Sequence, residues 1–298
     1  REAHLVLEYI DTAEPDINLL STLLINSVQE FEARSGGIAS LFVVDLQQVD
    51  EIGYNAGLPM SGMNVLRIPL LVEALRVLDE QPLPEQMALL RLAATDDDKA
   101  TSDLLLSMIA GEANPERGAE MFNAGMAVLG LQNTFITCPF SAEDSEECLS
   151  KETPANTIEN LVTAPDPFRQ TTAEDIGLLL SMLYYCAEND GGALRAIYSA
   201  DMTAPKCQLV IDLLSENRIG SLIEEGVPAG AQIAHRHSWQ TDVYGDGGII
   251  YSPNGDYVMV EFLHKPGWLA WEISSPLMAD LSRATFNFFN FDNQFLGQ

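Results

Sequence analysis

Lysine and arginine are scarce in this chain, and three of them stand in short polar clusters that could do chemistry. The sequence has 15 Lys and Arg against 44 Asp and Glu, which gives a formal charge of −29. Arginine can hold a carboxylate through two parallel hydrogen bonds. If the clusters converge, Arg67, Lys99, Arg236 and His237 would therefore bind a small anion or a peptide carboxylate. The clusters are Asn64 with Arg67; Asp97 and Asp98 with Lys99; and Arg236 with His237 and Ser238.

The same clusters have a second interpretation, in which their charges pair with one another and fill the space between them. Asp97 and Asp98 are the carboxylates within reach for such pairing. A buried charge is tolerated when it is paired and hydrogen-bonded. The residue types do not separate this closed arrangement from an open anion site, so both remain predictions.

Two histidines flank Arg236. Because side chains alternate along a strand, His235 and His237 are expected on one face and Arg236 on the other. The pair could bind a metal with a nearby carboxylate, or His237 could activate a water molecule. A hydrogen-bonded structural pair is the commoner role, so no metal or other cofactor is predicted. Trp239 beside them, with Trp268 and Trp271, is expected to pack in the core or at its rim.

The elements that must position these residues follow from apolar periodicity. An amphipathic helix over 16–34 ends at Gly36-Gly37, and a final helix spans 276–289. Strands are predicted at 38–46, 51–55, 232–237, 243–251 and 257–264. The middle is helical, over 65–79, 84–94, 101–109, 116–129, 172–187 and 206–215. Residues 138–171 are rich in proline and lack periodicity, which predicts an irregular loop.

This order predicts an α+β protein. Both chain ends build one five-stranded antiparallel sheet with the terminal helices packed on it. We expect an α/β sheet domain from residues 1–62 with 216–298, and an all-helical domain from residues 63–215. The clusters would lie in a cleft between the two.

Several stretches occur in the order and spacing of a known family. They are Asn64-Val65-Leu66-Arg67-Ile68-Pro69, Asp97-Asp98-Lys99, and Ala234-His235-Arg236-His237-Ser238 followed by Asp246-Gly247-Gly248. Over nearly its whole length the chain resembles the class A β-lactamase and penicillin-recognising serine hydrolase family. The stretches resemble that family's Ser-x-x-Lys, Ser-Asp-Asn and Lys-Thr-Gly motifs.

The resemblance implies a serine hydrolase site, but every short motif is altered. The family's serine attacks a carbonyl and its lysine exchanges the proton. Asn64 and Arg67 stand at those positions; an amide is a poor nucleophile, and arginine does not deprotonate in proteins. Asp97 replaces the second serine, Asp98 is retained, and Lys99 replaces the asparagine. The family's long loop carries a glutamate that activates water, and Glu159 lies in the corresponding loop without a definite register.

We therefore expect a β-lactamase-like pseudoenzyme that recognises a peptidoglycan-like peptide or a small anion in the former active-site cleft. One alternative is an active hydrolase of a β-lactam, peptide or ester that uses Ser61 as nucleophile, or His237 with a water molecule. Another is a structural or protein-binding module of a larger chain.

Composition narrows the partners and the location. An acidic chain of pI near 4.1 repels nucleic acids and anionic lipids, and no apolar run is long enough to span a membrane. The four cysteines could form two disulfides; Cys138–Cys148 and Cys186–Cys207 close the shorter loops, but three connectivities are open. Disulfides and the family resemblance favour an extracytoplasmic, secreted or envelope-anchored protein. Because the chain begins at Arg1, a leader could have been removed.

Overall fold

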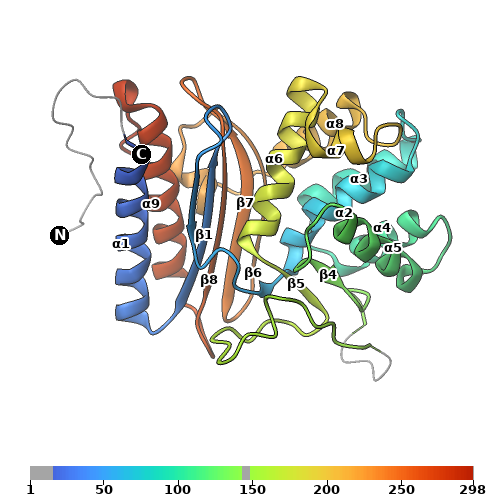
Figure 1. Cartoon of the computed structure of the whole chain (residues 1–298), viewed down its shortest axis with the longest axis horizontal. Helices are drawn as coiled ribbons and strands as arrows, with labels where there is room; N and C mark the ends of the chain where they lie inside the picture. Colours follow the sequence, from blue (N-terminus) through green and yellow to red (C-terminus); the bar gives the residue numbers. More distant parts are fainter. Residues whose placement is uncertain (1–15, 143–147, 298) are drawn as a thin grey trace.

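The computed structural model describes residues 16–142 and 148–297. Its centre is a five-stranded antiparallel sheet in the order β2-β1-β8-β7-β6, drawn edge-on in Figure 1. The sheet is built from both ends of the chain, as the sequence predicted. Its strands are β1 (Ile38–Asp45), β2 (Glu51–Tyr54), β6 (Gln232–Trp239), β7 (Val243–Tyr251) and β8 (Tyr257–His264). The β-lactamase-like α+β fold expected from the sequence is the fold observed.

Two helices cover one face of the sheet, α1 (Ile17–Ser35) and α9 (Trp271–Phe289), side by side at one end of the molecule in Figure 1. Asp16 caps the start of α1, and Gly36 ends it with φ 69°, a left-handed conformation that glycine adopts without strain. Leu20, Leu24 and Val28 of α1 are buried against the sheet. The short 3-10 helix η2 (Leu222–Gly226) packs against α9.

The opposite face carries the helical middle of the chain. Helix α6 (Ala173–Asn189) packs on β1, β7 and β8 and forms one core with them. The remaining helices lie beyond it (Figure 1): α2 (Arg67–Val77), α3 (Pro84–Thr95), α4 (Lys99–Ala110), α5 (Pro115–Val128), α7 (Gly192–Ile197) and α8 (Ala204–Ser215). A 3-10 turn, η1 (Met63–Leu66), leads into α2 and contacts β6.

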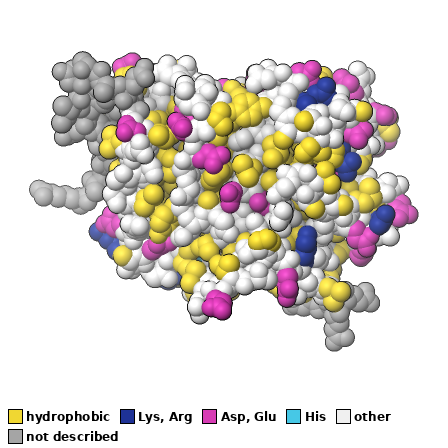
Figure 2. All heavy atoms as spheres, in the orientation of Figure 1, with side chains coloured by type: hydrophobic (Ala, Val, Ile, Leu, Met, Phe, Trp, Pro, Cys, Tyr) yellow, Lys and Arg dark blue, Asp and Glu magenta, His cyan; other side chains and the backbone are white. Residues whose placement is uncertain are grey.

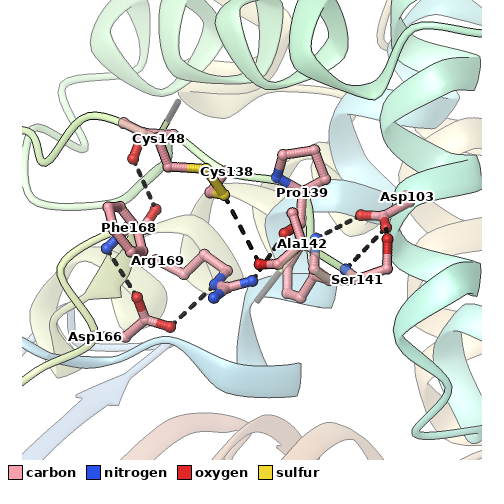
Figure 3. Close-up of a disulfide and its surroundings, with 11 residues drawn as sticks. Asp103, Cys138, Pro139, Ser141, Ala142, Cys148, Asp166, Phe168 and Arg169 are labelled. Carbon is pink, nitrogen blue, oxygen red and sulfur yellow. Dashed lines mark hydrogen bonds and ion pairs between the residues drawn. A yellow bond between two sulfur atoms is a disulfide. The ribbon is translucent and has the colours of Figure 1, made fainter. Parts of the chain in front are cut away.

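The long connection between β4 (Phe135–Ile136) and β5 (Arg169–Thr171), which precedes α6, is bonded to the rest of the fold near both of its ends. These two short strands and β3 (Met60–Ser61) form a second sheet. Figure 3 shows the Cys138–Cys148 disulfide and, beside it, Asp103 of α4 accepting hydrogen bonds from the N–H groups of Phe140 (2.6 Å) and Ser141 (3.0 Å). Arg169 donates to the Pro139 carbonyl at 2.9 Å.

The second disulfide, Cys186–Cys207, joins α6 to α8. Of the three connectivities open to the sequence, the structure has the one that closes the two short loops. Within the two described ranges, no helix is both long and apolar enough to cross a bilayer.

Three local differences separate the predicted elements from the observed ones. Helix α9 begins at Trp271 rather than at Pro276, so Pro276 lies inside the helix, where it has no N–H to donate to the carbonyl of Glu272. Helix α7 is too short to show periodicity. The strands of the second sheet have two or three residues each, which is below what alternation can reveal.

Candidate functional site

Arg67 begins α2 and is completely buried. Its guanidinium donates to the hydroxyl of Ser102 at 3.0 Å and to the backbone carbonyls of Ala93, Asp96 and Asp98. Burial, together with the smaller effect of the neighbouring Arg236 guanidinium, lowers the pKa of Arg67 to about 10. The side chain therefore stays protonated at neutral pH and cannot serve as a base.

Arg236 reaches the same loop from β6, and it too is completely buried. It donates to the carbonyl of Asp96, to the Asp97 carboxylate (2.7 Å) and to the side-chain oxygen of Asn217 (3.3 Å). Asn64 donates to the same Asp97 oxygen at 2.9 Å. Burial lowers the pKa of Arg236, which the Asp97 carboxylate partly offsets.

The structure thus brings together the arginines of two predicted clusters, Arg67 and Arg236. The loop of residues 95–98 lies between them. We call Arg67, Arg236 and residues 96–98 the arginine bridge, because it joins α2, the loop before α4 and β6. Of the two arrangements that the sequence left open, Arg67 and Arg236 adopt the internally paired one. Anion binding by Arg67, Lys99, Arg236 and His237 stays a prediction.

The histidines lie on one face of β6, with Arg236 directed to the other, as strand alternation predicted. Their ring centroids are 6.2 Å apart. Nδ1 of His235 lies 2.9 Å from Asp246, and its Nε2 lies 3.1 Å from the Asn217 carbonyl. Asn217 also donates to Nδ1 of His237 at 3.0 Å. The pair is therefore part of a buried hydrogen-bond network centred on Asn217.

This network determines which ring nitrogen of His237 carries the proton. Arg236 can only donate, so its contact identifies the oxygen of the Asn217 amide, and the amide nitrogen faces His237. Nδ1 of His237 accepts, which places the ring proton on Nε2. Burial lowers the pKa of His237 to about 4. The imidazole is neutral at pH 7 and presents a donor at Nε2, an arrangement opposite to that of a general base.

Ser61 lies on β3, outside the arginine bridge. Its hydroxyl oxygen accepts a hydrogen bond from the backbone N–H of Asp166 at 2.9 Å, and its strand pairs with β5 at Gln170. Within the described ranges no histidine or carboxylate is hydrogen-bonded to this hydroxyl. The structure gives Ser61 a role in fastening the long connection and provides no group to activate it.

Of the remaining predicted residues, only Asp98 belongs to the arginine bridge, through its backbone carbonyl. Lys99 is exposed at the start of α4, Glu159 is exposed in the long connection, and Ser238 is buried on β6. Asp98 is the N-cap of α4, where its carboxylate accepts from the N–H of Ala100. In the part of the chain that the structure describes, no group of three or more His, Cys, Asp or Glu residues could hold a metal ion.

Sequence reasoning missed Asn217 and Glu261. Glu261 on β8 is opposite Asp246 in the strand register and almost fully buried, and neither of its carboxyl oxygens has a partner among the described residues. Burial raises the pKa of Glu261 well above its ordinary value, and the Asp246 carboxylate raises it further. A glutamate in a Val- and Phe-rich strand is the one sequence signal that marks this position.

Replacing Glu261 by methionine is expected to raise the free energy of unfolding by about 1 to 3 kcal/mol, because a buried carboxyl without partners is removed. The gain should be larger at pH 8 than at pH 5. The unfolded state releases this proton near the ordinary pKa while the folded state keeps it, so the carboxyl costs more as the pH rises. Urea unfolding at both pH values tests this. Glu225→Met at an exposed position is the control, expected within about 0.5 kcal/mol of wild type; an equal effect there would contradict the account.

A five-stranded antiparallel sheet built from both chain ends, with α1 and α9 on one face and the helical middle on the other, is the β-lactamase-like fold. Residues 85–289 match the model of the "Beta-lactamase enzyme family". Because the match covers more than half of the chain, the protein belongs to this family. A search of curated proteins found no match.

Solved structures with this fold are similar over almost their whole length. A mutant of PBP-A, in an acyl-enzyme complex with penicillin G, is 17% identical with a TM-score of 0.68, over 94% of this chain and 99% of that one. A β-lactamase from Sphaerobacter thermophilus DSM 20745 is 15% identical with a TM-score of 0.68, over 91% and 98%. At these sequence identities the similarity shows a shared fold and nothing about activity.

Proposed function

We propose that this protein is a non-hydrolysing member of the β-lactamase enzyme family, a pseudoenzyme that acts by non-covalent recognition outside the cytoplasm. The observation that carries the proposal is the arginine bridge. Asn64 stands where the family resemblance places the nucleophile, and its amide is bonded to Asp97. Arg67 stands where the resemblance places the lysine, and it stays protonated.

The two alternative mechanisms, with Ser61 as the nucleophile or with His237 activating a water molecule, find little support in the geometry. Ser61 accepts a backbone hydrogen bond and has no base within the described residues. His237 directs a proton rather than a lone pair from Nε2, as argued above. An activated nucleophile needs an adjacent base with a suitable pKa. Neither residue has that combination.

Location outside the cytoplasm is supported by the two disulfides, which form and persist in oxidising compartments. A ligand in the former cleft would be a small anion or a peptide, as the sequence suggested. The donors of Arg67 and Arg236 are largely used by the protein itself, so such a ligand would meet the arginine bridge at its exposed edge, beside Asp97. Asp97 has a side chain that is 57% exposed.

Hydrolysis assays test the proposal. Wild type should turn over neither a chromogenic cephalosporin nor a thioester substrate above the buffer rate, while an active class A β-lactamase measured in parallel confirms the assay. Ser61→Ala and His237→Gln should equal wild type. Turnover by wild type that either substitution abolishes would contradict the proposal and identify the nucleophile or base in use.

A further inference from the structure

The three tryptophans of the chain gather at one end of the central sheet. Trp239 ends β6, Trp271 begins α9, and Trp268 lies in the connection between β8 and α9. Two backbone hydrogen bonds of 2.8 Å, from Lys265 to Asp242 and from Leu269 to Thr241, hold these segments together. Residues distant in sequence thereby form one surface.

The ring of Trp239 is held from two sides. His237 stacks on it at 4.9 Å between centroids with an interplanar angle of 25°, and Trp271 meets it edge-on at 5.0 Å. Tyr244 packs on Trp271, and its hydroxyl donates to the Leu269 carbonyl at 2.9 Å. Despite these contacts Trp239 is 44% exposed, and Trp268 is 64% exposed. A ring fixed before binding loses little conformational entropy when a ligand covers it.

The surroundings of these rings select the ligand. The π face of an indole is negative and attracts weakly positive C–H groups. Polar side chains that can donate or accept hydrogen bonds stand on the neighbouring residues Gln240, Thr241, Asp242 and Glu272. Acidic side chains outnumber basic ones on the face drawn in Figure 2 and in the chain as a whole, whose formal charge is −29. The charged residues beside the rings, Asp242, Lys265 and Glu272, sum to a net negative charge, so a neutral ligand is favoured over an anion at this surface. A neutral pyranose has both required features, an apolar C–H face and a rim of hydroxyl groups.

We propose that Trp239 and Trp268 form a binding platform for a neutral pyranose sugar within a glycan chain. His237 and Trp271 act as positioning residues that fix the ring of Trp239. The platform is separate from the arginine bridge, and binding to it requires neither the presence nor the absence of hydrolysis.

Intrinsic fluorescence tests this directly, because every tryptophan of the chain belongs to the platform or supports it. Titration of the full chain with chitotetraose or cellotetraose should give a saturable fluorescence change with at least one of them, and calorimetry should give the same affinity. Sorbitol, a polyol without a ring face, should give none. No change with either sugar by both methods would overturn the proposal.

The variants separate the platform from general effects on folding. Trp239→Ala should weaken sugar binding by calorimetry at least tenfold, whereas Trp239→Phe, which keeps a ring, should weaken it less. Leu104→Ala, at an exposed apolar residue on α4, should bind like wild type. Unfolding midpoints for each variant verify that the fold is intact. Unchanged binding in folded Trp239→Ala would overturn the proposal, as would concentration-dependent self-association that this substitution abolishes, since a second copy would then cover the surface.

Discussion

Replacing Arg67 by methionine is expected to lower the free energy of unfolding by about 3 to 5 kcal/mol, the range found when one partner of a buried charged network is removed. The substitution leaves the Asp98 carbonyl without its side-chain donor and removes one of the two arginine donors of the Asp96 carbonyl. It also separates α2 from the loop that precedes α4. Urea unfolding monitored by circular dichroism measures the effect.

Arg91 is the matched control for this prediction. Arg91 forms one ion pair, with Glu216 at 2.9 Å, and both of these side chains are largely exposed. Exposed pairs contribute little because water and salt screen them, so Arg91→Met should cost less than about 1 kcal/mol. If the two substitutions cost the same, the arginine bridge would not hold the helices to the sheet as described.

The second large effect is a pH dependence centred on His237. Its folded pKa of about 4 lies below the ordinary value of 6.5. Between these values the unfolded state binds the proton and the folded state does not, so stability falls as the pH is lowered from 7 to 4. Each pH unit in this interval changes the free energy of unfolding by about 1.4 kcal/mol, so the loss of stability at pH 4 reaches about 3 kcal/mol.

The loss is measured as the difference between wild type and His237→Gln at pH 7, 5.5 and 4. The comparison is needed because burial raises the pKa of Asp175 to about 6, which produces the opposite trend in both proteins and cancels in the difference. The gap between the two proteins should shift steadily in favour of the variant as the pH falls. If the free energies of unfolding of the two proteins change equally with pH, His237 is not the buried neutral imidazole described above.

Much of the fold could be predicted because its signals are local. The apolar spacing of α1, the Val-, Ile- and Tyr-containing runs of β7 and β8 and the helical middle each follow from a few residues of neighbouring sequence. The site could be predicted only in part. The family resemblance located Asn64, Arg67 and Arg236, but whether their charges bind a ligand or one another depends on how far the loop of residues 95–98 reaches.

What the sequence could not reveal comes from contacts across long stretches of chain. The Asp96 carbonyl that both arginines share is a backbone group without any sequence signature. Asn217 links His235, Arg236 and His237 although it lies 18 or more residues before them. Trp239 was expected to pack in the core or at its rim; in the structure it packs against His237 and Trp271 and is still 44% exposed.

A double variant, Asn64→Ser with Arg67→Lys, restores the residue types that the family resemblance calls for. An adduct with a penicillin on this variant would indicate that the former site is still reachable, so that the wild-type residues themselves prevent reaction. The absence of an adduct would indicate that the remaining contacts of Arg236 and Asp97 keep the site closed. Either result is compatible with a wild type that does not react.

The measurement that tests the central claim most directly is the intact mass of the wild-type protein after incubation with benzylpenicillin, beside an active penicillin-acylated enzyme as positive control. The account predicts that the wild-type mass does not change while the control gains the mass of one penicillin. A stoichiometric penicillin adduct on the wild-type chain would contradict the account, and the peptide that carries it would show which residue is the nucleophile.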